Sequence, residues 1–200
     1  MTFRSNDPGI MSRPAGRRSD RVHEAVLDAT AALLDEGGYP AATVDAIAGR
    51  SGVSKATIYK HWPTRAAVAA SAFGRVMADE MPPVDTGSTE GDVVEHLRRL
   101  AAFYASARGQ VFAQLLAACV VEPAGAPYFR EFFLAGRREA ITAIWQRAVA
   151  RGDVDPGVAV DDFIDLLAGP LIFRLLSGHA PLTAESTERL ARTCLAGLHR

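Results

Sequence analysis

The sequence lacks most features that would mark an enzyme, a metalloprotein or a membrane protein. Its two cysteines, Cys119 and Cys194, lie far apart and without metal-ligand spacing. The five histidines are scattered, no Ser-His-acid order fits a surrounding α/β pattern, and no Gly-rich phosphate loop is present. The longest apolar run, Leu115 to Val121, is too short to cross a bilayer. We therefore expect no catalytic residue, no cofactor, no metal and no membrane partner.

No secretory apolar block stands at the N-terminus, so we expect a cytoplasmic protein. In that setting the simplest role for both cysteines is as small buried hydrophobes, with a redox switch as the alternative. The 200 residues are 48% hydrophobic and 22% charged, which allows one sizeable core or two smaller ones.

A strong excess of positive charge is also missing. The formal net charge is -1, and residues 1–65 carry nine Lys or Arg against seven Asp or Glu, whereas residues 66–200 carry thirteen against sixteen. Bulk charge therefore does not indicate a nucleic-acid partner. Any affinity for DNA must come from where a few cations are placed.

Residues 43–62, TVDAIAGRSGVSKATIYKHW, predict two short helices joined by a tight turn. Thr43 is placed to cap the first helix, Gly52 supplies the turn, and Ser54 can cap the second helix. On that helix Ile58 and Trp62 lie four residues apart and share one face. The other face gathers cations, hydroxyls and small groups able to meet phosphates and base edges: Lys55, Ala56, Thr57, Tyr59, Lys60 and His61.

The residue order of this stretch resembles the DNA-binding domain of the TetR family of transcriptional regulators. The resemblance is carried by Tyr39, Thr43, Ala46, Ile47, Ala48, Gly52, Val53, Ser54, Thr57, Ile58, Tyr59, Trp62, Pro63, Thr64 and Arg65. It covers the first third of the chain by motif and the rest only by helical layout. One departure is that Ala66 and Ala67 follow Arg65, where the family often has an acidic residue.

The resemblance implies a set of DNA-binding residues. Thr43, Tyr59, His61 and Arg65 would mainly position the DNA backbone, whereas Lys55, Ala56, Thr57 and Lys60 would lie nearer the base edges, with Ser54 as the cap between the helices. For Tyr59, packing in the core is an equal alternative.

The predicted fold is all-α, with an N-terminal helix-turn-helix domain of three helices followed by a helical ligand-binding and dimerisation domain, about nine helices in all. Residues 1–18 are expected to form a disordered basic arm. This arm either follows the DNA phosphates or enters the minor groove, or it serves only as a solubilising tail. Met11 is an alternative start of the chain. The DNA-binding domain is predicted at residues 19–65 and the second domain at residues 66–200. The first helix is expected to begin at Ser19 or Asp20 and to end at Gly37-Gly38. Further helices are expected at residues 64–80, 128–151 and 160–177, among others.

The helix at residues 160–177 is apolar around more than one stripe, so one neighbouring surface does not account for it. With the final helix it suits a four-helix interface between two subunits, which is how TetR-like proteins dimerise; the alternative is core within one chain. The candidate interface residues are Phe163, Leu167, Leu171, Leu175, Leu190, Cys194 and Leu198. Asp161, Asp162 and Asp165 fit a solvated acidic face at a helix N-terminus better than a metal site.

The second domain is also rich in large aromatic side chains, and the resemblance implies that a ligand pocket lies there. Pro170, inside a predicted helix, can kink it and open space. The candidate pocket residues are Phe103, Phe112, Phe129, Phe133, Trp145 and Phe173, although each also fits plain core.

These features predict a ligand-responsive repressor that binds an inverted-repeat operator in double-stranded DNA as a homodimer and is released by a small, largely apolar effector. One alternative is a small-molecule-binding protein with weak or vestigial DNA binding. Another is a module that grips a protein through the helix-turn-helix, which would show weak salt dependence. The choice between repression and activation stays open.

Overall fold

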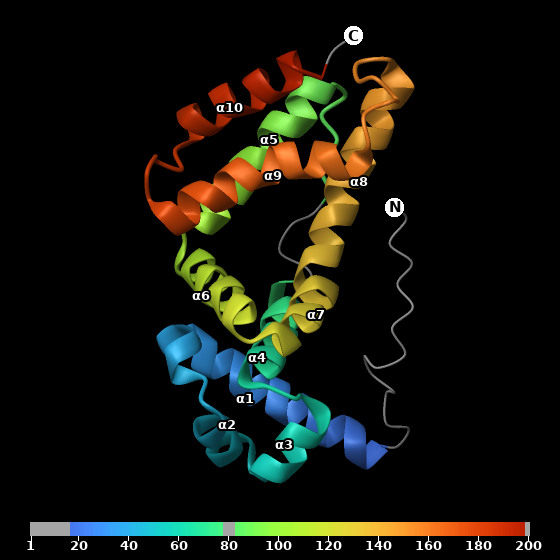
Figure 1. The fold of residues 1–200 in the computed structure, drawn as a ribbon. Helices are drawn as coiled ribbons and strands as arrows, with labels where there is room; N and C mark the ends of the chain where they lie inside the picture. Colours follow the sequence, from blue (N-terminus) through green and yellow to red (C-terminus); the bar gives the residue numbers. More distant parts are fainter. Residues whose placement is uncertain (1–16, 78–82, 199–200) are drawn as a thin grey trace. The chain divides into compact units, whose positions relative to one another are not determined.

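A computed structural model describes residues 17–77 and 83–198 of the chain. These residues form helices and loops without a β-strand, which confirms the prediction of an all-α fold (Figure 1). The expected basic arm lies almost wholly outside the described residues, as does the end of the helix predicted at residues 64–80.

The chain divides into two compact units. Unit 1 holds the described residues up to Val76 together with Leu115–Phe133, and unit 2 holds those of Met77–Gln114 and of Leu134 onward. The sequence analysis drew its boundary after Arg65 instead. The helix that follows Arg65 belongs with the N-terminal helices because its first residues, from Ala66 to Ala70, are fully buried.

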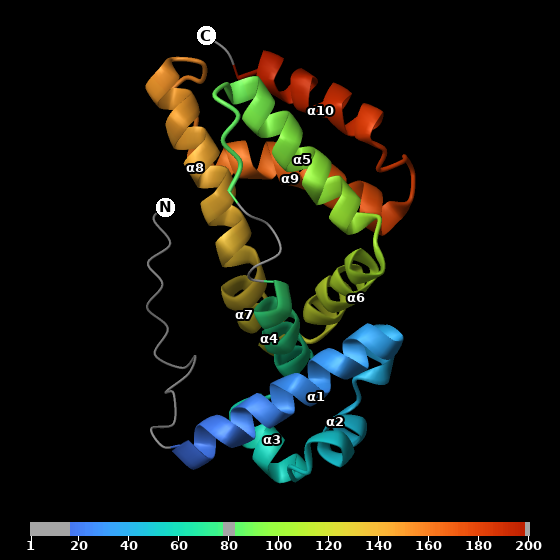
Figure 2. The same ribbon diagram turned by 180° about the vertical axis from the view of Figure 1, so that it is seen from behind.

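Unit 1 is built around a long first helix. The backbone of α1 leaves helical geometry at Gly37 and Gly38, where its end was predicted. α2 and α3 lie on one side of α1 and α7 on the other (Figures 1 and 2). The elements are α1 (Arg17–Ala41), α2 (Val44–Ser51), α3 (Lys55–His61), α4 (Arg65–Met77), the later part of α6 (Ala107–Val121), a 3-10 turn (Pro123–Gly125), α7 (Ala126–Phe129) and a π-helical turn (Arg130–Leu134).

The core of unit 1 joins the helix-turn-helix to the helix after it. Trp62 is almost completely buried, and its indole Nε1 donates a hydrogen bond to the Ser71 hydroxyl of α4 at 3.1 Å. Gly74 of α4 lies against the π-helical turn so closely that a Cβ there would collide with the carbonyl of Phe132. The close approach explains why this position has no side chain.

The π-helical turn also explains one difference from the sequence analysis. A single helix was predicted at residues 128–151, but the structure has α7, the π-helical turn at Arg130–Leu134, and then α8. The π-helical turn is a single-turn interruption inside an otherwise helical segment, so the chain stays helical on both sides of it.

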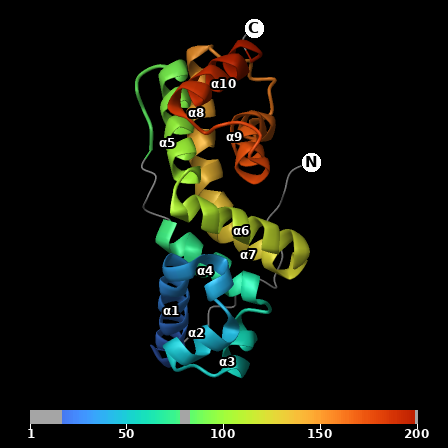
Figure 3. The same cartoon turned by 90° about the vertical axis from the view of Figure 1, so that its left-hand side faces the viewer.

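Unit 2 is a helical bundle. It contains α5 (Thr89–Tyr104), the first part of α6, α8 (Ala135–Arg151), α9 (Val160–Ser177) and α10 (Ala184–Ala196). α5 packs against α8, α9 and α10, and Figure 2 shows α10 running beside α5. α9, seen nearly along its axis in Figure 3, contacts both α5 and α8. The bounds predicted for α9 agree with the structure.

A buried ion-pair network fixes the start of this bundle. The Asp92 carboxylate of α5 is fully buried and accepts hydrogen bonds from Thr86 N at 2.6 Å and from Thr86 Oγ1 at 2.9 Å. It also accepts from the Arg147 guanidinium of α8 at 3.0 Å and from Arg151 at 3.4 Å. The buried charge is therefore paired and hydrogen-bonded, as burial requires.

Candidate nucleic-acid interface and ligand cavity

The frame of the candidate nucleic-acid interface is set by local capping. Thr43 caps α2, its hydroxyl accepting the Ala46 N–H at 3.1 Å, and Ser54 caps α3 by accepting the Thr57 N–H at 3.3 Å. Between the helices Gly52 has a φ of 69°, a left-handed conformation that residues with a Cβ rarely adopt. These three roles were predicted from the sequence and are confirmed.

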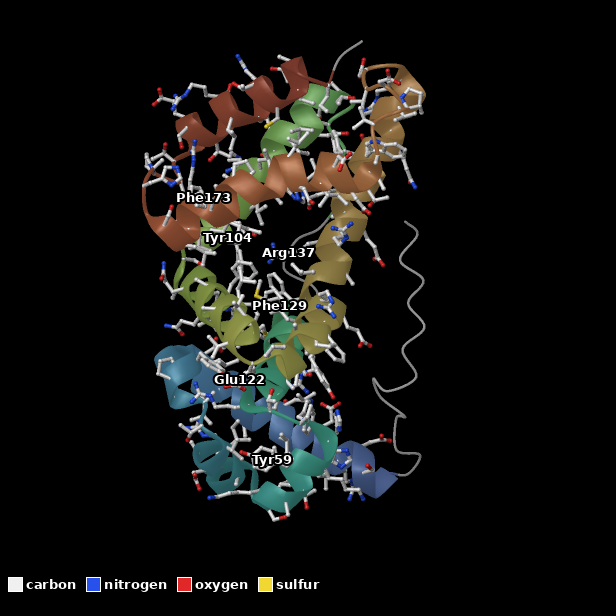
Figure 4. The ribbon with its side chains drawn as sticks, in the orientation of Figure 1. Tyr59, Tyr104, Glu122, Phe129, Arg137 and Phe173 are labelled. Carbon is white, nitrogen blue, oxygen red and sulfur yellow. The ribbon has the colours of Figure 1, made fainter. Side chains whose placement is uncertain are left out.

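The two faces of α3 differ in burial. Ile58 and Trp62 are buried in unit 1. Lys55, Ala56, Tyr59 and Lys60 are exposed, whereas Thr57 and His61 are half-buried. Tyr59, labelled in Figure 4, has 51% of its surface exposed, so core packing does not explain it. α3 thus presents cations, an aromatic hydroxyl and a small side chain outward on a capped, rigid helix.

Several side chains of this face already have partners in the free protein. Lys55 forms an exposed ion pair with Asp45 of α2, and the hydrogen bond from Lys55 to that carboxylate raises the pKa of Lys55. The hydroxyls of Ser54 and Thr57 lie 2.9 Å apart and share a hydrogen bond. A nucleic-acid phosphate or base must therefore replace these local contacts, although it does not have to expose a buried side chain.

His61 and Arg65 contact other side chains of unit 1. The His61 ring lies edge-on to His23, with ring centroids 5.5 Å apart. Burial, and then the proximity of His61, lower the pKa of His23. The Arg65 guanidinium lies over the Tyr39 ring at 3.8 Å, a cation-π contact. Burial raises the pKa of Tyr39, opposed by Arg65. Both predicted DNA-binding residues are thus also held by packing.

Unit 2 contains a partly open cavity of about 180 Å³ between α5, α8 and α9. Its wall is mostly apolar, with a few polar and charged groups. The lining residues are His96, Leu100, Tyr104, Leu134, Arg137, Arg138, Ile141, Ile164, Asp165, Ala168, Gly169 and Ile172.

Three titratable groups converge on this cavity: His96 and Tyr104 are buried, and Arg137 is half-buried. Burial lowers the pKa of His96 to about 4, helped by the charges of Arg137 and Arg99, so this imidazole is neutral near pH 7. Burial raises the pKa of Tyr104 to about 12, opposed by Arg137. Burial also lowers the pKa of Arg137 to about 10, which leaves the guanidinium charged at neutral pH. Figure 4 shows the Arg137 side chain reaching from α8 toward the side where Tyr104 lies.

Comparison with known proteins identifies the family to which this chain is related. The family model described as bacterial regulatory proteins, tetR family, matches residues 26–72, and the one described as tetracyclin repressor-like, C-terminal domain, matches residues 83–194. The HTH-type transcriptional regulator YdeS of Bacillus subtilis is 38% identical over 167 residues, which are 84% of each chain. The chain belongs to the tetR family.

Solved structures of tetR-family and related regulators share its fold. The transcription regulator SCO0332 is similar with a TM-score of 0.76 and 28% identity, over 90% of this chain and all of that one. The flavonoid-responsive regulator FrrA is similar with a TM-score of 0.60 and 26% identity, over 89% of this chain and 95% of that one. The prediction of a DNA-binding, ligand-responsive transcriptional regulator is confirmed at the level of the family.

The cavity of this tetR-family regulator is not lined by the aromatics that the sequence analysis selected. Phe112 is fully buried against Tyr104, with ring centroids 5.1 Å apart, and Phe103 lies under the Arg137 guanidinium at 4.4 Å. Phe129 and Phe133 stack on each other in unit 1. Trp145 is half-buried, and Phe173 is 64% exposed. None of these six lines this cavity, so it differs from the pocket that was predicted from the sequence.

The size of a side chain is a poor guide to pocket residues because large side chains fill space, whereas a cavity needs small residues that leave space. Ala168 and Gly169 provide it on α9, and a Cβ added to Gly169 would meet nothing within 4 Å. The sequence does contain a signal for one polar group of the cavity wall. His96 lies between Val93 and Leu100 on the apolar face of α5, where a polar residue stands out.

The predicted interface residues also need correction. Phe163, Leu167 and Leu171 are at most 1% exposed within the single chain, so they belong to the core of unit 2 and leave no surface for a partner. Leu175, Leu190 and Cys194 are half-buried, and Leu198 is buried. α9 instead exposes a different apolar stripe, formed by Leu166, Phe173 and Leu176. This stripe shares no residue with the predicted interface, whose half-buried members Leu175, Leu190 and Cys194 stay a prediction.

The acidic residues at the start of α9 are exposed, and Asp161 forms an ion pair with Arg138 of α8. Across residues 17–77 and 83–198, no group of three or more His, Cys, Asp or Glu side chains is arranged to hold a metal ion. No helix within that part of the chain is long and apolar enough to cross a membrane.

Proposed function

We propose that this tetR-family regulator represses transcription by binding an inverted-repeat operator as a homodimer, and that a small effector in the cavity of unit 2 releases it. The observation that carries the proposal is the outward face of α3, where Lys55, Ala56, Tyr59 and Lys60 are exposed on a helix that is capped at its N-terminus and anchored by Trp62. A helix held in this way can enter a major groove without reorganising.

The homodimer is supported by the exposed stripe on α9. Leu166, Phe173 and Leu176 are 46%, 64% and 51% exposed, and they share one helix. Exposed large apolar side chains in one stripe are typical of a contact surface. Two copies related by a two-fold axis would bury the same stripe on each subunit. Two α3 helices would then meet successive major grooves roughly 34 to 36 Å apart.

The effector part of the proposal is supported by the cavity. A partly open, mostly apolar cavity with a few convergent polar groups has the character of a small-molecule site. A bound molecule changes DNA affinity only if it prefers one arrangement of the protein over the other. Because operator DNA is in the cytoplasm, the proposal also locates the protein there, and it assigns no enzymatic activity to it.

Binding to short duplexes tiled across the DNA that flanks the gene, at two salt concentrations, tests the DNA-binding role. We expect one inverted-repeat segment to bind saturably and to weaken steeply with salt, because each phosphate contact contributes a slope of about -0.9. Lys60→Ala should weaken this complex and reduce the salt slope by about two in a dimer, one for each subunit. Arg98→Ala, an exposed arginine in unit 2, is the control and should bind as the wild type does.

Uniform weak binding, or the same salt slope for Lys60→Ala and the wild type, would contradict this role. It would favour a small-molecule-binding protein with vestigial DNA binding.

The oligomeric state is tested by light scattering coupled to gel filtration. Phe173→Asp should convert the dimer to a monomer, since it introduces a charge into the proposed contact. Val120→Asp serves as the control because Val120 of α6 is also highly exposed and apolar but lies outside the α9 stripe. A Phe173→Asp protein that stays dimeric would rule out this surface as the interface.

A further inference from the structure

The cavity of unit 2 narrows the class of molecule that it can hold, given the proposed role as an effector site. Its volume of about 180 Å³ is close to the roughly 150 Å³ of a cavity that binds benzene. It is below the roughly 300 Å³ at which sites for drug-sized ligands begin. The occupant is therefore about the size of one six-membered ring with a short substituent.

The wall of the cavity carries a half-buried positive charge, that of Arg137. The Arg137 guanidinium lies over the Phe103 ring, with its Cζ 4.4 Å from the ring centroid, a cation-π contact. A charge that is partly withdrawn from water attracts an anion more strongly than one that is fully exposed. The guanidinium fork also matches a carboxylate, which it can bind through two parallel hydrogen bonds.

The other polar groups of the wall are compatible with an anion. The Tyr104 phenol keeps its proton at neutral pH and can donate it in a hydrogen bond, and the neutral His96 imidazole has one N–H to donate. Two further charges belong to the lining. The Arg138 guanidinium forms an ion pair with Asp161. Asp165 is an exposed residue of α9, so the negative charge of its carboxylate is screened by solvent.

The rest of the wall suits an apolar body. It is formed by alkyl side chains, and open space remains beside the small residues of α9. These residues are Leu100, Leu134, Ile141, Ile164, Ala168, Gly169 and Ile172.

We propose that the cavity binds a small organic acid, with its carboxylate on the guanidinium of Arg137 and its ring or branched alkyl body among the side chains of α5, α8 and α9. The assignment rests on the proposed function only in taking this cavity as the effector site. It replaces the expectation of a largely apolar effector with an amphipathic anion.

Titration calorimetry with two probes of nearly equal shape tests the charge requirement directly. Benzoate carries the carboxylate, and benzamide is its neutral counterpart. We expect the wild-type protein to bind benzoate at least roughly tenfold more tightly than benzamide, because a charge-assisted pair is lost with the amide. This comparison uses only the wild-type protein.

Variants then locate the site. Arg137→Gln should remove the preference for benzoate, and Ala168→Leu should block both probes by filling the cavity. Arg98→Gln makes the same chemical change on α5 at an exposed position and should leave benzoate binding unaltered. Thermal unfolding identifies a variant that has lost its fold, in which case the wild-type comparison of the two probes decides.

Equal affinity for benzoate and benzamide, or no binding of either, overturns the assignment. So does a benzoate preference that survives in Arg137→Gln. Operator binding measured with and without benzoate separates the two proposals. Benzoate that binds through Arg137 and leaves DNA affinity unchanged would support the site and contradict the effector role. Intact operator binding without a preference for benzoate would support the DNA-binding role and contradict the organic-acid ligand.

Discussion

The buried carboxylate of Asp92 should make one of the largest single side-chain contributions to the stability of unit 2. It accepts hydrogen bonds from Thr86 and is paired with the guanidinium groups of Arg147 and Arg151. Removing one partner of a buried ion pair typically costs 3–5 kcal/mol. Both arginine side chains are 28–29% exposed and can turn toward Asp85 or water, which lowers that figure. We expect Asp92→Ala to lower the free energy of unfolding by about 3 kcal/mol.

Urea unfolding followed by circular dichroism measures this loss, with Asp85→Ala as the matched control. Asp85 forms long ion pairs to Arg147 and Arg151, at 3.9 and 3.7 Å, and accepts one exposed hydrogen bond from the Gly87 N–H at 3.3 Å. Because it is 62% exposed, its loss should cost less than about 1 kcal/mol. Asp92→Asn, which keeps an acceptor for Thr86, should fall between the two. An Asp92→Ala protein within about 1 kcal/mol of wild type would refute the reasoning.

The same carboxylate gives the wild type a pH dependence of known sign. Burial by itself raises the pKa of Asp92, but the hydrogen bonds from Thr86 and the Arg147 guanidinium outweigh it and lower the pKa below the ordinary value of 3.8. The stabilisation is therefore complete above pH 3.8 and is lost as the pH falls through the lower, folded-state value. The difference between wild type and Asp92→Ala should shrink over that range.

Three further predictions concern other parts of the chain. Because the folded-state pKa of His96 is about 4 against 6.5 when unfolded, wild-type stability should rise by about 3 kcal/mol between pH 4 and 6.5. His96→Phe should flatten this rise in urea unfolding measured across the pH range. Gly74→Ala should destabilise unit 1 by about 1–3 kcal/mol, seen as a lower thermal midpoint, because its Cβ meets the Phe132 carbonyl; an unchanged midpoint would contradict that contact. Thr43→Ala should cost about 1 kcal/mol through the lost α2 cap, and Thr43→Ser should restore most of it.

The parts of the structure that could be predicted from the sequence are the local ones. Thr43, Gly52 and Ser54 act on their own helix ends through atoms within four residues, so their types and spacing were enough to assign their roles. The inward positions of Ile58 and Trp62 followed from helical periodicity for the same reason.

The cavity and the exposed stripe could not be predicted, because they depend on which helix faces which. α9 is apolar on three sides: one is core, one lines the cavity and one is exposed, and residues such as Leu167, Ile164 and Leu166 look alike in sequence. Only the packing of α5 and α8 against α9 distinguishes these sides. Likewise, the guanidinium of Arg137 lies at a cavity wall because of its neighbours, not because of its flanking residues.

The composition of α3 has a practical consequence. Lys55 and Lys60 are the only two lysines in the sequence, and both side chains are exposed on this helix. An amine-reactive reagent therefore has no side-chain target elsewhere in the chain, and acylation of either residue removes a charge from the surface proposed to face DNA. The rate of labelling becomes a direct measure of how much of the helix is covered by DNA. A lysine-specific protease would cut the folded chain only within α3, so it could inactivate this surface while sparing the bundle of unit 2.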